Sequence, residues 1–121
     1  MRPVAVHHVS LNVDDVEAAL SFYCDILGLE PRVDRPDFPF GGAWLDIGGQ
    51  QVHLIEGKPP PGLGQHFAIL VDDLEATVTE LRDRGVEVSD PKPVGSSRQA
   101  FITDPAGNLV ELHQAAAASA S

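Results

Sequence analysis

Hydrophobic and polar positions along the first quarter of the chain predict a strand followed by a helix. Residues 4–13 are rich in valine and alternate between apolar and polar side chains, which predicts a β-strand. Four apolar residues then recur at the spacing of a helix that packs on a sheet: Val16, Leu20, Tyr23 and Leu27. Asp14 and Glu17 have the spacing of an N-terminal capping box, and Gly28 is expected to end the helix.

The next segment predicts short strands joined by turns. Residues 29–42 contain several prolines and glycines, and we expect a strand fragment followed by a loop. Residues 43–47 and 51–56 are predicted to form a hairpin around a Gly-Gly turn. The Pro- and Gly-rich residues 57–64 have the composition of a linker.

After the linker the same pattern returns. Residues 65–71 predict a strand, and a helix should follow it, with a second capping-box spacing at Asp72 and Glu75 and its end at Gly85. Three apolar residues form the stripe of this helix: Leu74, Val78 and Leu81. Residues 100–103 and 109–113 are predicted to pair as strands around a turn at 104–108, whose Pro and Gly suit a turn.

The chain is thus an internal repeat with an offset of 58 residues, the separation of His8 from His66. The same offset, without gaps, aligns three further pairs: Asp14 with Asp72, Asp46 with Asp104, and His53 with Glu111. A repeat of this kind reports architecture more dependably than a single motif. We therefore predict one domain, residues 1–114, built from two modules at about 4–57 and 65–114, with residues 115–121 as a frayed tail.

Composition narrows the function classes. The 121 residues carry a formal net charge of −10, which argues against binding to nucleic acid or to anionic lipid. Cys24 is the single cysteine, so an intramolecular disulfide is excluded and a reducing compartment is expected. No apolar run approaches the ~20 residues of a membrane span, and the first ten residues lack the pattern of a signal peptide. We expect a cytoplasmic protein.

Four residues that suit metal chemistry fall on one set of strand faces. Alternation along the strands turns His8, His53, His66 and Glu111 away from the predicted helices. If the two modules pair about a pseudo-twofold axis, these three imidazoles and one carboxylate would line a shared cleft. Such a donor set suits Zn, Fe, Ni, Mn or Co, and two His with one carboxylate leave positions open for a substrate.

Other residues near these strands are candidates for binding a substrate. Alternation along their strands places Trp44 and Phe101 on the same faces as the candidate ligands, where they would form an apolar wall. Positions in the core fit them equally. Arg98 would either hold an anionic group of the substrate or lie in solvent. His113 shares the face of Glu111 and is interpreted as structural.

The two ends of the chain resemble the vicinal oxygen chelate superfamily. The resemblance lies in HHVSLNVDDVEAALSFYCDILGL near the start and FITDPAGNLVELH near the end. It implies an α+β fold in which two βαβββ modules form a cupped mixed sheet, a small-molecule substrate and, in most members, a homodimer. In metal-using members the ligands lie on the first and last strands of each module, where this chain has His8, His53, His66 and Glu111. Glyoxalase-like members carry Glu or Gln where His53 stands, so His53 is a ligand, an acid–base group or a residue behind the ligands.

This resemblance suggests a metal-dependent enzyme, a glyoxalase-like lyase or isomerase. The divalent metal would bind two neighbouring oxygens of a small substrate and stabilise an enediolate or alkoxide, while His53 or Glu111 moves a proton. Two alternatives stay open: an extradiol-type dioxygenase, and a bleomycin-type drug-binding protein without catalysis. We expect a homodimer in which the first module's ligands come from one chain and the second module's from the other.

Overall fold

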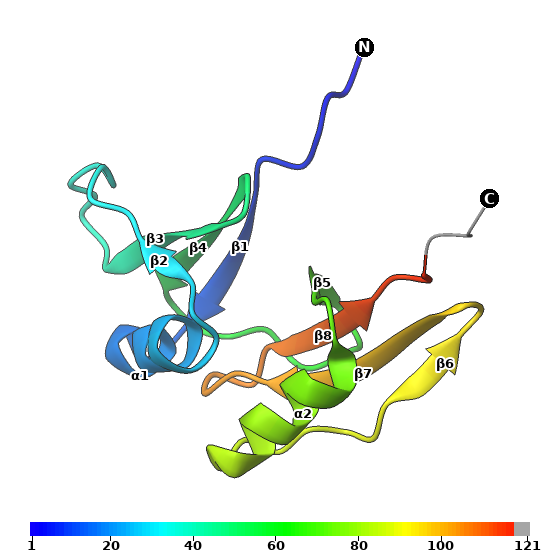
Figure 1. Cartoon of the computed structure of the whole chain (residues 1–121). Helices are drawn as coiled ribbons and strands as arrows, with labels where there is room; N and C mark the ends of the chain where they lie inside the picture. Colours follow the sequence, from blue (N-terminus) through cyan, green and yellow to red (C-terminus); the bar gives the residue numbers. More distant parts are fainter. Residues whose placement is uncertain (118–121) are drawn as a thin grey trace. The chain divides into compact units, whose positions relative to one another are not determined.

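The computed structural model describes residues 1–117, and the chain divides into two compact units (Figure 1). Unit 1 contains residues 1–61 together with 104–108. Unit 2 contains residues 62–103 and the chain from Leu109 onward. Of the predicted tail, residues 118–121 lie outside the described part, and residues 115–117 have no helix or strand. No helix within residues 1–117 is long and apolar enough to span a membrane.

Unit 1 is a four-stranded mixed sheet with a helix on one face (Figure 1). Its elements are β1 (His8–Val13), α1 (Val16–Leu20), η1 (Ser21–Ile26), β2 (Glu30–Pro31), β3 (Gly42–Ile47) and β4 (Gln50–Glu56). The strand order is β1-β4-β3-β2, in which β1 runs parallel to β4 and the other neighbours are antiparallel.

Unit 2 repeats this topology. Its elements are β5 (His66–Leu70), α2 (Leu74–Asp83), β6 (Lys92–Val94), β7 (Ser97–Thr103) and β8 (Leu109–Gln114). The strand order is β5-β8-β7-β6, with β5 parallel to β8. Two mixed sheets that each carry a helix confirm the predicted α+β fold class.

The strand registers show where the 58-residue offset holds. His8 pairs with Gln51, and His66 pairs with Leu109, so β1, β4, β5 and β8 keep the offset. The antiparallel strand departs from it: Trp44 lies opposite His53, whereas Phe101, 57 residues after Trp44, lies opposite Glu111. The turn between β7 and β8 is one residue longer than the turn between β3 and β4. The equivalent pairs show this: Asp46 pairs with Gln51, five positions on, whereas Thr103 pairs with Leu109, six positions on. Asp46 and Asp104, aligned in the sequence, are therefore not structural equivalents.

Both helices begin one residue later than predicted. Asp15, in extended conformation, accepts a hydrogen bond from the amide of Ala18, and Asp73 does the same for Ala76. The capping boxes predicted from Asp14 and Asp72 are therefore wrong. Likewise the first strand begins at His8 and not at residue 4, since residues 4–6 lie beyond the end of the parallel ladder with β4.

The buried face of the first helix also differs from its predicted stripe. Val16, Leu20 and Leu27 are only half-buried, while the buried residues are Ala19, Phe22 and Tyr23. From Ser21 the helix is a π-helix, and its i→i+5 turn rotates the following side chains relative to an α-helix. The predicted stripe of α2 is confirmed, because Leu74, Val78 and Leu81 are all buried.

The turn at 104–108 is held by the buried carboxylate of Asp104. One oxygen, Oδ1, accepts from the amides of Ala106 and Asn108 at 2.9 Å each. The other, Oδ2, accepts from the Tyr23 hydroxyl at 2.8 Å and from the Asn108 side chain at 3.0 Å. Asn108 also donates to the carbonyl of Asn12 at 3.0 Å. This turn interrupts the sequence of unit 2, yet its polar contacts anchor it in unit 1.

Tyr23 is expected to stay un-ionised at a pH at which free tyrosine titrates. Burial raises its pKa well above the usual value near 10, and the charge of Asp104 and its hydrogen bond act in the same direction. Because the folded state disfavours tyrosinate, this contribution to stability is complete below pH ~10 and is lost as the pH rises further. Tyr23 is the only tyrosine, so tyrosinate absorbance follows it directly. A native-state midpoint near 10, equal to that of the denatured chain, would contradict the prediction.

Candidate functional site

Three of the predicted site residues meet on one face of the unit 1 sheet. His53 on β4 lies between His8 on β1 and Trp44 on β3, with its ring nearly parallel to both. The ring centroids are 3.9 Å apart for His8 and His53 and 4.4 Å apart for Trp44 and His53. We call His8, His53 and Trp44 half-site 1. Their common face follows from the register, which places Ser10 and Trp44 opposite His53.

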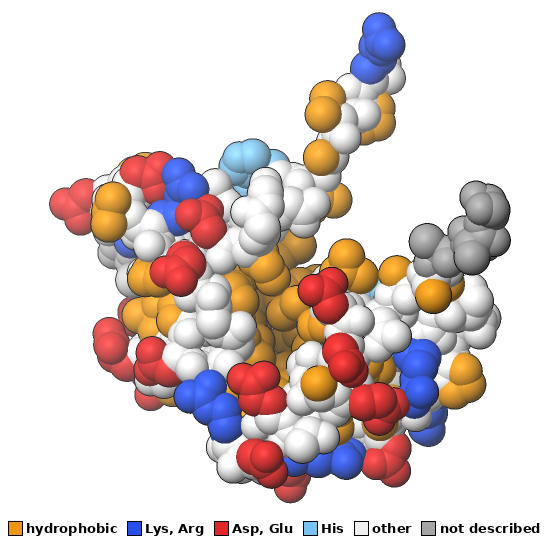
Figure 2. Space-filling model, in the orientation of Figure 1, with side chains coloured by type: hydrophobic (Ala, Val, Ile, Leu, Met, Phe, Trp, Pro, Cys, Tyr) orange, Lys and Arg blue, Asp and Glu red, His pale blue; other side chains and the backbone are white. Residues whose placement is uncertain are grey.

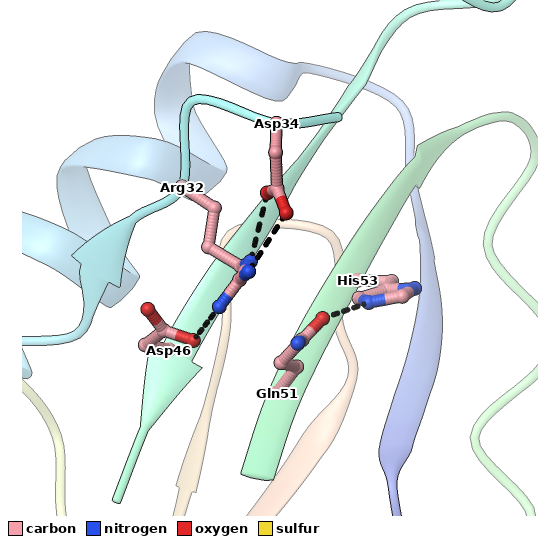
Figure 3. A network of polar contacts seen from close by, with 5 residues as sticks. All are labelled: Arg32, Asp34, Asp46, Gln51 and His53. Carbon is pink, nitrogen blue, oxygen red and sulfur yellow. Dashed lines mark hydrogen bonds and ion pairs between the residues drawn. The ribbon is translucent and has the colours of Figure 1, made fainter. Parts of the chain in front are cut away.

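The hydrogen bond from His53 fixes its tautomer. Its Nε2 is 2.7 Å from Oε1 of Gln51, which is an acceptor, so His53 donates from Nε2 (Figure 3). Burial lowers the pKa of His53, and the nearby His8, His7 and Arg32 lower it further. The ring is therefore held neutral, and its Nδ1 carries the free lone pair.

The stacking of His8 on His53 restricts how the two rings can bind a metal. Their planes are inclined by only 12°. An imidazole nitrogen binds an ion in the plane of its own ring, and two stacked, nearly parallel planes have no such point in common near both rings. In this arrangement, at most one of the two can direct its lone pair at a given ion.

A charged network lies beside half-site 1. Arg32 donates to both carboxylate oxygens of Asp34, at 2.9 and 2.8 Å, and to Asp46 at 2.8 Å (Figure 3). The guanidinium hydrogen bonds lower the pKa of Asp34. The positive charge of Arg32 is thereby neutralised locally, and Arg32 ties the segment after β2 to strand β3.

An aromatic platform extends from half-site 1 into the loop before β3. Phe38 is tilted against Trp44, with centroids 6.3 Å apart, and is stacked on Phe40 at 4.9 Å. The Arg35 guanidinium lies 5.0 Å from the Phe38 ring centre and 5.6 Å from that of Phe40. Both phenylalanines are exposed. Part of this aromatic surface is therefore open to solvent.

The other two predicted ligands meet in unit 2. His66 at the start of β5 has its Nε2 3.1 Å from Oε1 of Glu111 on β8. His113, also on β8, has its Nδ1 2.8 Å from Oε2 of the same carboxylate. Phe101 packs edge-on against His66, with centroids 5.3 Å apart. Glu111 is only 8% exposed. We call His66, Glu111 and His113 half-site 2.

Both ring nitrogens of His66 face acceptors. Nδ1 is 2.9 Å from the carbonyl oxygen of Gly64, and Nε2 faces Glu111. A neutral imidazole has one N–H, so it satisfies only one of them. To satisfy both contacts at once, His66 must carry a second proton or share a cation with Oε1 of Glu111. The Gly64 hydrogen bond, followed by the bond and charge of Glu111, raises the pKa of His66 against the opposing effect of burial.

The spacing of His66 and Glu111 also fits a metal. Nitrogen and oxygen ligands that bind one ion at right angles, each roughly 2.1 Å from it, lie about 3 Å apart. The observed separation is 3.1 Å. The two residues thus fit a divalent cation, although within residues 1–117 no three His, Cys, Asp or Glu side chains form a group that could hold a metal ion. Each unit brings two of the four predicted ligands together, His8 and His53 in unit 1 and His66 and Glu111 in unit 2.

Arg98 and His113 each contact a carboxylate that was not predicted as a partner. Arg98, a candidate for binding the substrate, forms an ion pair with Glu75 of α2 at 2.7 Å and is not brought to half-site 2. It shares the parity of Ala100 and Ile102, which are buried on the helix side of β7. His113 shares the face of Glu111, as predicted, and contacts the carboxylate of that candidate ligand. Its position two residues after Glu111 on one strand was the signal for that contact.

Comparison with known proteins identifies the family. A model of the Glyoxalase/Bleomycin resistance protein/Dioxygenase superfamily matches residues 5–112, and the chain belongs to this superfamily. A Synechocystis protein named probable lactoylglutathione lyase is 34% identical over 88% of the chain and 92% of its own length.

Solved structures show the same fold. A glyoxalase family protein from Bacillus anthracis has a TM-score of 0.83 and 26% identity, over 94% of this chain and 98% of that one. TnmS3, an antibiotic binding protein from Streptomyces sp. CB03234, has a TM-score of 0.76 and 29% identity, again over 94% and 98%. The relatives thus include a named lyase and an antibiotic binder, and the family alone does not choose between them.

Proposed function

We propose that the chain is a metal-dependent enzyme of this superfamily, a glyoxalase-like lyase or isomerase acting on a small substrate with two neighbouring oxygen atoms. The observation that carries the proposal is His66: its Nδ1 contacts the carbonyl oxygen of Gly64, and its Nε2 lies 3.1 Å from Oε1 of Glu111, a separation that a divalent cation would fit. The similarity to a protein named as a lyase supports the choice of reaction class.

The proposed ligands are His8, His66 and Glu111. Zn, Ni, Fe, Mn or Co all suit this donor set. When bound, such an ion would act as a Lewis acid toward the substrate oxygens. Because each unit supplies only part of the set, we propose a homodimer in which His8 comes from one chain and His66 and Glu111 from the other.

We assign proton transfer to His53 in this proposal. Its stacking on His8 argues against both rings serving as ligands to one ion. Gln51 holds the Nε2 proton, which leaves Nδ1 as the atom that would accept a proton. Trp44 and Phe101 are proposed as apolar walls that keep water from the reacting atoms.

Metal content tests the proposal. Purified protein incubated with Zn²⁺ and then dialysed is expected to retain the ion, and His8→Ala and His66→Ala are expected to lose it. Arg98→Ala is the matched control, since Arg98 is paired with Glu75 and is outside both half-sites. Substoichiometric metal that is unchanged by His8→Ala would refute the ligand set. Oxygen consumption with a catechol in the Fe²⁺-loaded protein would indicate the dioxygenase instead.

Mixing two inactive variants tests the shared-site dimer. His8→Ala and Glu111→Ala proteins are each expected to bind no metal. If each site takes ligands from both chains, random reassociation makes half of the dimers mixed, and each mixed dimer has one intact site. About a quarter of all sites should therefore recover. No recovery after verified exchange of chains would place the ligands of each site in one chain.

The aromatic platform of unit 1 favours a second candidate, a drug-binding protein. Its exposed Phe38 and Phe40 suit a flat apolar ligand, and the antibiotic binder TnmS3 has the same fold. Trp44, the only tryptophan, adjoins this platform, so its fluorescence should change when a planar antibiotic binds. This function would be favoured if the metal-free protein bound the antibiotic tightly and if the His8→Ala variant bound it equally well.

A further inference from the structure

The carboxylate of Glu111 has a second neighbour besides the proposed ligand His66. This side chain is 11% exposed, and each of its two oxygens contacts a different imidazole. Oε1 faces His66 at 3.1 Å, and Oε2 faces His113 at the shorter distance of 2.8 Å. The orientation of the carboxylate is therefore set by two neighbours, of which only one is a proposed ligand.

The chemistry of the His113 contact allows one direction of donation. An ionised carboxylate only accepts hydrogen bonds, so Nδ1 of His113 must carry the proton. A hydrogen bond to a charged acceptor is shorter and stronger than one between neutral groups, in agreement with the 2.8 Å distance. The contact is also local: both residues lie on the same face of β8, two positions apart.

We infer that His113 is a positioning residue for Glu111: its Nδ1–H holds Oε2 so that Oε1 is presented toward Nε2 of His66. This inference rests on the proposed function, because it assigns the presented oxygen to the metal. A carboxylate ligand that is hydrogen-bonded through its other oxygen loses less freedom when the ion binds. Partners behind a metal ligand commonly change metal affinity by about 10–100-fold.

Two variants separate this role from a general effect on structure. His113→Ala removes the donor and is expected to weaken Zn²⁺ binding by about 10–100-fold, as measured by competition with a chelator. His113→Asn should recover much of the affinity, because its amide N–H occupies the place of Nδ1–H. Gln99→Ala is the control: Gln99 lies opposite His113 on β7 and leaves the bond to Glu111 intact.

The metal-free protein gives an independent readout. Nitrogen–proton correlation NMR should show Nδ1 of His113 protonated in the wild-type chain, and an Nε2–H tautomer with a bare Nδ1 would overturn the inference. The inference would also be overturned if wild-type protein bound Zn²⁺ through His66 and His113→Ala bound it with the same affinity. The proposed function would stand in that case. If the wild-type protein bound no Zn²⁺, both the proposed function and the role of His113 toward a metal would be refuted.

Discussion

Asp104→Ala is expected to lower the free energy of unfolding by about 3 kcal/mol. The substitution removes the acceptor for the Tyr23 hydroxyl, for two turn amides and for the Asn108 side chain. Tyr23 is fully buried, so its hydroxyl would be left without a partner and without water. The loss of a buried acceptor of this kind is more damaging than the loss of an ordinary hydrogen bond.

Chemical denaturation measures this effect, and the repeat supplies a matched control. Asp46 aligns with Asp104 in the sequence but forms a partly exposed ion pair with Arg32. Asp46→Ala should therefore change the unfolding free energy by no more than about 1 kcal/mol. Tyr23→Phe should lie between the two, since it removes one donor and leaves the turn amides bonded. Equal effects of Asp104→Ala and Asp46→Ala would show that the turn is not anchored as described.

Glu111→Gln is expected to weaken Zn²⁺ binding by more than about 100-fold. This exceeds the effect expected when a residue that only hydrogen-bonds to a metal ligand is replaced. The amide keeps the size of the side chain but removes the negative charge that offsets the dication. It also gives His113 no charged acceptor. Titration with Zn²⁺ in competition with a chelator measures the change.

Glu75→Gln is the control for the Glu111 substitution. It makes the same chemical change in the same unit, but Glu75 is on α2 and pairs with Arg98. Its Zn²⁺ affinity should equal that of the wild-type chain. If Glu111→Gln also retained full affinity, the carboxylate would have no part in binding, and the proposed ligand set would have to be abandoned.

The acidic surface also bears on the substrate. Asp and Glu side chains are spread over the visible face of the molecule and outnumber the basic ones there (Figure 2), in agreement with the net charge of −10. Such a surface attracts the divalent cation that the proposal requires and disfavours polyanions. The same field attracts a cationic drug, so it does not separate the proposed enzyme from the drug-binding protein.

The sequence predicted the faces of the strands well, because alternation is a property of extended backbone itself. It placed His53 and Trp44 on one face of unit 1, and His66, Phe101 and Glu111 on one face of unit 2, and ring and carboxylate contacts in each unit agree. The ligand role of these residues stays a prediction.

The local backbone conformation at the start and in the middle of the first helix could not be predicted from the sequence. Both Asp14 and Asp15 can cap a helix, and only the extended conformation of Asp15 decides between them. The π-helical turn from Ser21 has no signature in the apolar spacing, and it places Phe22 beside the predicted Tyr23 on the buried face. Such choices depend on how the helix packs against the sheet rather than on propensity.

By itself, then, the sequence determined the repeat and the faces of the strands, which follow from periodicity, and its resemblance to the superfamily implied the α+β class. The tertiary structure decided which groups meet. It joined His113 to Glu111, turned both nitrogens of His66 toward acceptors, and anchored Asp104 to Tyr23, 81 positions away. Periodicity fixes the face of a side chain, but the partner of a polar group depends on register, turn length and burial, which the folded chain alone sets.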